Sequence, residues 1–209
     1  MEKPRIAIIG AGIAGLACAR ELSRADARVT VYERSRTLGG RLGTYRRGDF
    51  AFDHGAQYIT ARSRSFTSYV GVAGRAGAVQ SWRPSIMEDD RAWQEPIDDW
   101  QVGTPGMSAL IRPLSRSLDL RTGVTVHELV QSQRGWELQT DAGREDLIYD
   151  AIGVAVPAPQ GDSLSINLIA SSTDHGSLYG RLLVSASNTS AMATMRAETG
   201  IFLPANPLG

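Results

Sequence analysis

The sequence predicts an α/β fold in which helices cover a parallel β-sheet. Three observations lead to this prediction. The first is a β-branched apolar run at residues 5–9, the second is an amphipathic helical pattern over residues 15–24, and the third is another β-branched run at residues 29–32. A strand, a helix and a strand in this order form a βαβ unit, whose two strands are parallel. We therefore expect the first two strands to pair beneath the first helix.

A glycine-rich loop of residues 10–15, Gly-Ala-Gly-Ile-Ala-Gly, directly follows the first predicted strand. Gly10 permits a sharp turn, Gly12 lets the backbone approach a pyrophosphate, and Gly15 lets the helix pack closely on the strand. The helix N-terminus, with Ile13 and Ala14 in its first turn, supplies free amides and a positive dipole end. The loop therefore predicts the phosphate-binding turn of a dinucleotide site.

The predicted helix carries a buried stripe, and the second strand ends in an acidic residue. Residues at the i, i+3, i+4 and i+7 positions are Gly15, Cys18, Ala19 and Leu22. The strand at residues 29–32 leads to Glu33, with Arg34 beside it. A carboxylate at this position can accept hydrogen bonds from both hydroxyls of an adenosine ribose, and it would repel a 2′-phosphate. This first site therefore disfavours NADP.

Residues 33–41, Glu-Arg-Ser-Arg-Thr-Leu-Gly-Gly-Arg, resemble the segment after the second strand in the FAD-dependent amine oxidase superfamily. In that family the glycine pair and the arginine approach the FAD pyrophosphate. The chemistry is suitable here, because Gly39 and Gly40 allow a close backbone approach and Arg41 offers a forked cation to phosphate oxygens. The resemblance implies that the cofactor is FAD.

Two later segments resemble the renalase-like branch of this superfamily: residues 53–62, which contain Gly-Ala-Gln-Tyr, and residues 102–110, which contain Pro-Gly-Met. The resemblance runs from about residue 5 to Gln160. It implies that four residues lie beside the isoalloxazine ring: Gly55, Ala56, Gln57 and Tyr58. Gln57 can donate and accept hydrogen bonds, and Tyr58 can form an aromatic wall. The resemblance also implies that the Val126 backbone pairs with the adenine and that Pro157 closes over the dinucleotide.

The resemblance implies a Rossmann-like FAD-binding domain interleaved with a partial α+β substrate domain. We expect an FAD half-site at residues 1–62, the partial substrate domain at 63–118, a hairpin and return to the FAD domain at 119–160, and an atypical tail at 161–209. Helical spacing predicts helices at residues 63–77 and from Ser108 to Leu118, the second bent at Pro113. Strand patterns precede and follow a turn at Asp89-Asp90, and further strands are expected at residues 124–126, 129–140 and 147–156.

The resemblance stops after Gln160. The family continues for more than a hundred residues and ends with a Gly-Asp FAD motif before a last helix, whereas Gly161-Asp162 lacks that context. Residues 161–209 have few charges and no long amphipathic stripe, so they predict no helix or domain. Our hypothesis is that the chain is a truncated or frame-altered member whose last 49 residues are not the family's own sequence.

Composition excludes several classes of protein. The 209 residues include 22 acidic and 22 basic side chains, so no polycationic surface for nucleic acid is expected. No apolar run is long enough to span a membrane, and the N-terminus lacks a secretory pattern. A single cysteine, Cys18, excludes an internal disulfide and fits a reducing cytoplasm. The histidines, His54, His127 and His175, are too dispersed for a metal site.

The leading functional prediction is a renalase-like FAD-dependent oxidoreductase. It would transfer hydride from a small reduced substrate, of dihydronicotinamide or amine type, to the flavin and then to oxygen. No catalytic side chain is assigned, because in such a step the protein mainly orients substrate and cofactor. The alternative is a catalytically inactive, truncated FAD- or nucleotide-binding module. An NAD-dependent dehydrogenase fits the first glycines but leaves residues 39–41 and 55–58 unexplained. The sequence does not predict an oligomeric state.

Overall fold

The computed structural model describes residues 2–85, 98–157, 164–167 and 201–204. These residues form two compact units. The sheet unit contains residues 2–40 and the described residues from Leu114 onward, and the insert unit contains residues 41–113. Among the described residues, the chain therefore leaves the sheet unit once, builds the insert unit, and returns.

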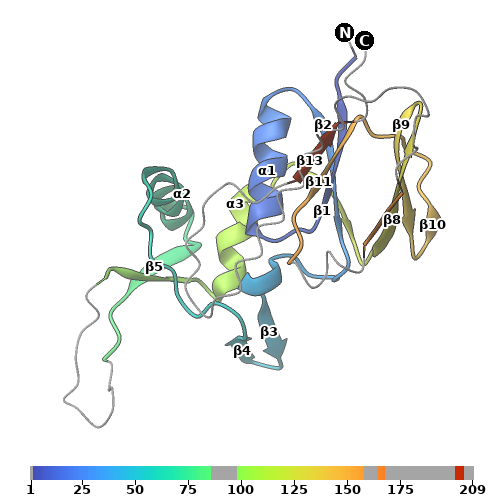
Figure 1. Ribbon diagram of the computed structural model, residues 1–209. Coiled ribbons are helices and arrows are strands. Elements are labelled where there is room, and N and C mark those ends of the chain that lie inside the picture. The colour runs from blue at the N-terminus through green and yellow to red at the C-terminus, as the bar shows by residue number, and fades with distance from the viewer. Residues whose placement is uncertain (1, 86–97, 158–163, 168–200, 205–209) are drawn as a thin grey trace. The chain divides into compact units, whose positions relative to one another are not determined.

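A five-stranded sheet, in the order β13-β11-β1-β2-β7, is the centre of the sheet unit (Figure 1). Its neighbours are parallel except β13, which pairs antiparallel with β11. The elements are β1 (Arg5–Ile9), α1 (Ile13–Arg24), β2 (Arg28–Glu33), β7 (Asp119–Thr122), β11 (Ala151–Val154) and β13 (Ile201–Pro204). The predicted α/β fold with a parallel sheet is confirmed. Because β1 has β2 on one side and β11 on the other, the strand order reverses at β1.

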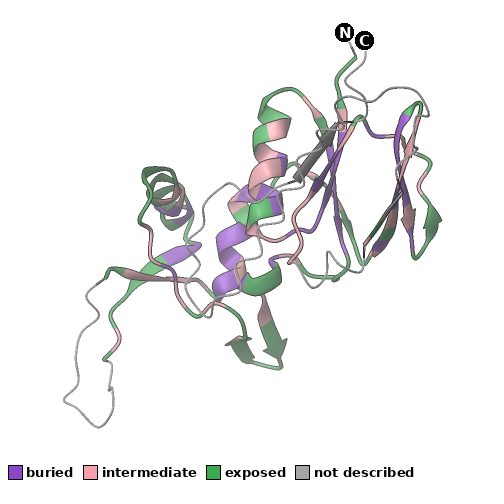
Figure 2. Ribbon diagram, in the orientation of Figure 1, coloured by how far each residue is buried: buried purple, intermediate pink, exposed green. Residues whose placement is uncertain are grey.

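Apolar residues explain the central strands and α1. Ile8 in β1 and Val31 in β2 are fully buried, as expected for β-branched residues in a parallel sheet (Figure 2). The buried face of α1 consists of Gly15, Leu16 and Ala19. The predicted stripe was therefore only partly right, because Cys18 is half-buried at the edge of this face. Burial raises the pKa of the Cys18 thiol, which agrees with a packing role.

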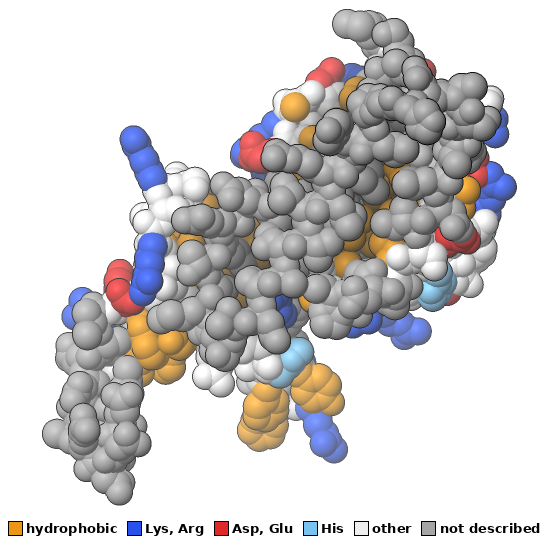
Figure 3. Space-filling model, viewed as in Figure 1, with side chains coloured by type: hydrophobic (Ala, Val, Ile, Leu, Met, Phe, Trp, Pro, Cys, Tyr) orange, Lys and Arg blue, Asp and Glu red, His pale blue; other side chains and the backbone are white. Residues whose placement is uncertain are grey.

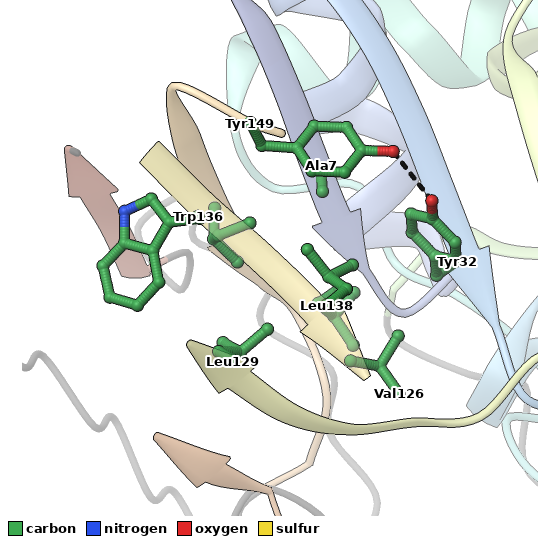
Figure 4. Close-up of a cluster of buried hydrophobic side chains, with 9 residues drawn as sticks. Ala7, Tyr32, Val126, Leu129, Trp136, Leu138 and Tyr149 are labelled. Carbon is green, nitrogen blue, oxygen red and sulfur yellow. Dashed lines mark hydrogen bonds between the residues drawn. The ribbon is translucent and has the colours of Figure 1, made fainter. Parts of the chain in front are cut away.

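A second sheet of the sheet unit has the order β10-β9-β8-β12. Its strands are β8 (Val126–Ser132), β9 (Gly135–Thr140), β10 (Gly143–Arg144) and β12 (Ser165–Asn167). The hairpin predicted at residues 129–140 is confirmed by the antiparallel pairing of β8 with β9. One buried cluster joins this sheet to the first, and it contains Ala7 and Tyr32 from the first sheet and Leu129, Trp136 and Leu138 from the second (Figure 4).

The insert unit contains two antiparallel pairs of strands and a helix. The elements are β3 (Thr44–Arg47), β4 (Phe50–Asp53), α2 (Arg64–Arg75), β5 (Val79–Trp82) and β6 (Trp100–Gly103), with the 3-10 helix η1 (Gly40–Leu42) at its start. Strand β3 pairs with β4, and β5 pairs with β6. The helix predicted at residues 63–77 is confirmed as α2, which begins after Ser63, whose side chain accepts a hydrogen bond from the Phe66 amide.

The helix predicted from Ser108 to Leu118, with a bend at Pro113, is confirmed in part. The chain forms the 3-10 helix η2 (Met107–Ile111) and, directly after it, the four-residue α3 (Arg112–Ser115), so the helical run ends before Leu118. Pro113 has no amide to donate, and its ring disfavours a preceding helical turn. Ser117 then takes a left-handed conformation with φ 64°, which ends the helix.

Several strand predictions need revision. Strand β8 begins at Val126 rather than at residue 124, and β11 occupies only the centre of the expected strand at 147–156. The β3–β4 hairpin and β7 were not predicted. The expected turn at Asp89-Asp90 lies outside the described residues. In residues 161–209, where no element was predicted, β12 and β13 each add a short strand to a sheet.

Candidate dinucleotide site

Gly10 lies where the carboxyl ends of β1 and β11 meet. Its φ is +105°, and its amide donates to the Tyr32 carbonyl at 2.7 Å. A Cβ at Gly10 would lie 2.8 Å from the Ala155 carbonyl oxygen, and the Ala155 amide donates to the Ile9 carbonyl at 2.8 Å. The backbone here is both left-handed and crowded, so only glycine fits. This is the switch point of the sheet, where open α/β sheets bind their ligands.

The N-terminus of α1 is suited to an anion. Gly12 is the N-cap and offers no side-chain hydrogen bond, and the first turn, beginning with Ile13 and Ala14, holds no acidic residue. The amides of this turn therefore receive no hydrogen bond from an N-cap side chain. A Cβ at Gly12 would meet nothing within 4 Å, whereas a Cβ at Gly15 would overlap the Gly10 carbonyl oxygen. Gly12 thus borders open space, and Gly15 is a packing position.

Glu33 is held in place by two backbone amides. One carboxylate oxygen accepts a hydrogen bond from the Ala11 amide at 2.8 Å, and the other accepts from the Ser35 amide at 2.9 Å. The residue is only 9% exposed. Each oxygen has a second lone pair, so the carboxylate can still accept hydrogen bonds from ligand hydroxyls. Arg34, the next residue, is exposed.

The two glycine motifs are in direct backbone contact. The Gly39 amide donates to the Ala11 carbonyl at 3.0 Å, and Gly12 and Gly39 form a parallel bridge. Gly40 has a φ of +53°, and a Cβ there would lie 3.7 Å from the Gly12 Cα. Residues that are far apart in sequence therefore present their backbones to the same place, as a pyrophosphate site requires.

In the insert unit, Arg41 lies beside the Gly-Ala-Gln-Tyr segment of residues 55–58. The Ala56 amide donates to the Arg41 carbonyl at 2.9 Å. A Cβ at Gly55 would overlap that carbonyl oxygen, which explains why glycine is needed there. Gln57 is exposed, and its amide group is available to a ligand. The structure thus brings together Arg41 and the segment expected at the flavin end.

Tyr58 is part of an aromatic cluster with Trp82 and Trp100. Its ring stacks on Trp100 with 3.7 Å between centroids and 3° between planes, and Trp82 is tilted against both. The next residue, Ile59, exchanges two backbone hydrogen bonds with Gln101 in β6. One face of Tyr58 is therefore already occupied, so the aromatic wall expected here includes tryptophan as well as tyrosine.

Two predicted residues lie further along the chain. Val126 is the first residue of β8 and is buried in the core between the two sheets. Pro157 is half-buried and follows β11, and the side chain of its neighbour Val156 comes within 3.1 Å of a Cβ at Gly10. The sequence did not single out Ala11 or Ala155. Their backbone groups act through partners on other strands, which no local pattern reveals.

The described residues contain neither a metal-ligand cluster nor a helix that could span a membrane. No group of three or more His, Cys, Asp or Glu side chains in these ranges is arranged to hold a metal ion. Within the same ranges, no helix has the length and apolar character needed to cross a membrane.

Comparisons with known proteins agree with this geometry. A family model described as an NAD(P)-binding Rossmann-like domain matches residues 8–70. An L-amino-acid oxidase from Sistrurus catenatus edwardsii is 34% identical over 89 residues, which are 43% of this chain and 16% of the relative. The flavin-dependent L-tryptophan oxidase RebO from Lentzea aerocolonigenes is 33% identical over 93 residues, 43% of this chain and 20% of the relative.

Solved structures extend the likeness to the fold. A putrescine oxidase crystallised with putrescine superposes with a TM-score of 0.60 and 12% identity, covering 79% of this chain and 61% of that one. The chain spans a fifth or less of the length of the curated oxidases named above. The predicted flavin agrees with these matches, since RebO is named as flavin-dependent. Over part of its length the chain is thus similar to amino-acid oxidases, residues 8–70 match a Rossmann-like domain, and the fold is shared with a putrescine oxidase.

Proposed function

We propose that this chain binds FAD and belongs to an FAD-dependent oxidoreductase of the renalase-like branch. One observation supports the proposal most strongly: the Gly39 amide bonds to the Ala11 carbonyl, and the bridge it forms with Gly12 joins the two glycine motifs. A dinucleotide-binding turn alone would serve NAD equally well. The second motif, joined to the first through the backbone, favours FAD, because the family resemblance assigns residues 39–41 to the FAD pyrophosphate.

In this proposal the sheet unit binds the AMP and pyrophosphate end. The uncapped amides at the start of α1 and the backbone of Gly12, Gly39 and Gly40 approach the phosphates. The open space beside Gly12 is consistent with this role, because a side chain there would occupy the approach.

Glu33 receives the ribose hydroxyls. Its two amide contacts orient the carboxylate before a ligand arrives, so little side-chain entropy is lost on binding. Arg34 is placed beside it, the Val126 backbone pairs with the adenine, and Pro157 closes over the dinucleotide. These last assignments come from the family resemblance.

For the flavin end the proposal follows the family resemblance, which makes Arg41 a phosphate ligand and implies that residues 55–58 lie beside the ring. Bound FAD would supply a two-electron acceptor that takes a hydride from the substrate and delivers both electrons, with two protons, to O₂ as hydrogen peroxide. The chain's own contribution is orientation: Gln57 hydrogen-bonds flavin or substrate, and the Tyr58–Trp100 pair forms an apolar wall. The substrate is a small reduced molecule of dihydronicotinamide or amine type.

An absorbance spectrum of the purified chain tests cofactor binding. We expect flavin bands in the visible range, either as isolated or after addition of FAD followed by gel filtration. NAD added in the same way serves as the comparison for the dehydrogenase alternative. A chain that retains no flavin after reconstitution contradicts the proposal, and retention of NAD in place of FAD supports a dehydrogenase.

Anaerobic reduction separates the substrate classes. A reconstituted chain whose flavin is bleached by dihydronicotinamides and not by primary amines or amino acids supports the renalase-like branch. The opposite pattern supports the wider amine oxidase group, to which the curated relatives belong by name. Admission of oxygen should then restore the flavin absorbance and release hydrogen peroxide.

The second candidate is an inactive FAD- or nucleotide-binding module. The described contacts of Gly12, Gly39 and Glu33 concern the nucleotide end, and no catalytic side chain is assigned. If FAD or ADP binds but none of these reductants bleaches the flavin, this candidate is correct.

A further inference from the structure

The β3–β4 hairpin of the insert unit has two chemically different faces. Thr44 pairs with Asp53 across the hairpin, and both side chains bind the start of η2. Tyr45, Phe50 and Phe52 are all more than half exposed, and hydrophobic side chains stand out from this hairpin in Figure 3. The polar face of the hairpin, formed by Thr44 and Asp53, therefore makes contacts within the insert unit.

Asp53 and Thr44 are hydrogen-bonded to each other, and each accepts one hydrogen bond from η2. One Asp53 oxygen accepts from the Thr44 hydroxyl at 2.6 Å and from the Met107 amide at 2.9 Å. The Thr44 oxygen in turn accepts from the Ser108 amide at 3.1 Å. Amides at the start of a helical turn lack partners within the helix, so these bonds satisfy two of them.

The same contact fixes the turn before η2. A Cβ at Gly106 would lie 2.7 Å from the Thr44 side chain, and a Cβ at Gly103 would overlap the Gly106 carbonyl. Met107 is fully buried. The turn of residues 103–107 is thus packed against the hairpin. A small shift of Asp53 or Thr44 would therefore require this turn to move as well.

Asp53 is also the last residue of β4, two positions before the Gly-Ala-Gln-Tyr segment. Beyond Asp53, that segment is held at Ala56 by the Arg41 carbonyl and at its end by the Tyr58–Trp100 stack and the Ile59–Gln101 bonds. Asp53 is the side chain that connects the start of this segment to the turn at residues 103–107.

We propose that Asp53 is a positioning residue: through its bonds to Thr44 and the Met107 amide, it sets the path of residues 55–58 and so the placement of Gln57 and Tyr58. The consequence for flavin rests on the proposed function, whereas the consequence for the path of the segment does not. An isosteric amide retains the accepting oxygen, so Asp53→Asn should preserve this role and Asp53→Ala should remove it.

Amide hydrogen exchange of the chain without added flavin tests the path directly. In Asp53→Ala we expect the Met107, Ser108 and Ala56 amides to exchange at least about tenfold faster, a factor that corresponds to about 1.4 kcal/mol. Amides of β1 and β2 should be unchanged. Asp53→Asn should behave like wild type, and so should the matched control Asp49→Ala, an exposed carboxylate between β3 and β4.

Faster exchange at Met107 and Ser108 with no change at Ala56 would overturn the proposal, because Asp53 would then only cap η2. If Asp53→Ala fails to fold, Thr44→Val provides the second test. It removes the acceptor of the Ser108 amide and leaves the Asp53–Met107 bond. Faster exchange at both Ser108 and Ala56 supports the proposal, and a change at Ser108 alone contradicts it.

The visible absorbance spectrum of bound flavin separates an effect of Asp53 on the flavin end from its effect on the path of residues 55–58. If wild type binds FAD, Asp53→Ala should change the shape of the visible flavin bands while Asp53→Asn restores them, and unchanged bands in Asp53→Ala would contradict an effect on the flavin end. If wild type binds no FAD, the proposed function fails, but the exchange at Ala56 still decides whether Asp53 positions the segment.

Discussion

At the scale of single residues, two glycines of the same loop have opposite surroundings. A Cβ at Gly15 would overlap the Gly10 carbonyl, whereas a Cβ at Gly12 would meet nothing within 4 Å. The backbone at Gly12 is extended, with φ −71° and ψ 176°, which any residue can adopt. We therefore expect a side chain at Gly15 to affect the stability of the fold and a side chain at Gly12 to affect ligand binding.

We predict that Gly15→Ala destabilises the fold and that Gly12→Ala does not. Overpacking against backbone at Gly15 should lower the free energy of unfolding by about 1–3 kcal/mol. Gly12→Ala should unfold like wild type in urea, yet bind FAD or ADP more weakly. Equal loss of stability in both variants, or full affinity in Gly12→Ala, would contradict this assignment.

Glu33 has a structural role and, under the proposed function, a role in binding the ribose. Glu33→Ala leaves the fully buried Ala11 amide without its acceptor, so the free energy of unfolding should fall by about 1–3 kcal/mol. Affinity for AMP measured by calorimetry should fall by about tenfold or more, because a charged acceptor is lost. Glu21→Ala is the control, since Glu21 is exposed on α1. Unchanged AMP affinity in the folded Glu33→Ala variant would exclude a role in ribose binding.

The sequence predicted those residues whose role depends on local spacing. Gly10, Gly12, Gly15 and Glu33 follow from a strand, a turn and a helix in register, and all lie at the carboxyl ends of β1 and β2. The partners of these residues could not be read in this way. Ala155 crowds Gly10 from more than a hundred residues away, and nothing in its own neighbourhood marks it.

At the scale of elements, strongly apolar strands were predictable and polar ones were not. Strand β7, Asp-Leu-Arg-Thr, is half-exposed or exposed throughout and pairs only with β2 among the described strands. It is strand because β2 presents an unpaired edge, a cause that lies outside its own sequence. The helix after Met107 ends earlier than predicted, at Ser115, and the left-handed backbone of Ser117 just beyond it is not revealed by the apolar periodicity.

Packing of β8 and β9 on the main sheet gives an element-scale prediction. Leu129 is fully buried in the cluster that joins the two sheets (Figure 4). Leu129→Ala should lower the free energy of unfolding by about 2–5 kcal/mol, from lost transfer energy and the cavity left behind. Chemical denaturation measures it, with Val72→Ala as the control because Val72 is 46% exposed. A loss no larger than that of the control would mean that β8 does not pack as described.

At the scale of the whole molecule, a buried pair of phenols makes stability depend on alkaline pH. The Tyr32 and Tyr149 hydroxyls are 2.7 Å apart, and both residues are 1% exposed. Burial raises the pKa of both phenols above the ordinary value of 10.0. The folded state therefore keeps protons that the unfolded state releases above pH 10, so the stabilisation is complete below that pH and is lost as pH rises beyond it.

We expect the free energy of unfolding to fall above pH 10, by up to about 1.4 kcal/mol per pH unit for each phenol. The double variant Tyr32→Phe with Tyr149→Phe removes both hydroxyls and leaves neither unpaired, so its stability should depend less on pH above 10. Tyr45→Phe, an exposed tyrosine, should keep the wild-type slope. Parallel curves for wild type and the double variant, measured by urea denaturation, would contradict the assignment.

The place of β11 has a consequence for the order of events during synthesis. Residues 5–40 contain β1, α1, β2 and both glycine motifs, so this part can begin to fold while the rest of the chain is still being made. The wall that Ala155 and Val156 add beside Gly10 is translated much later. A nascent chain can thus arrange the amides at the start of α1 early, but the backbone beside Gly10 is complete only after β11 has left the ribosome. Under the proposed function, we therefore expect the cofactor to be bound late in the synthesis of the chain.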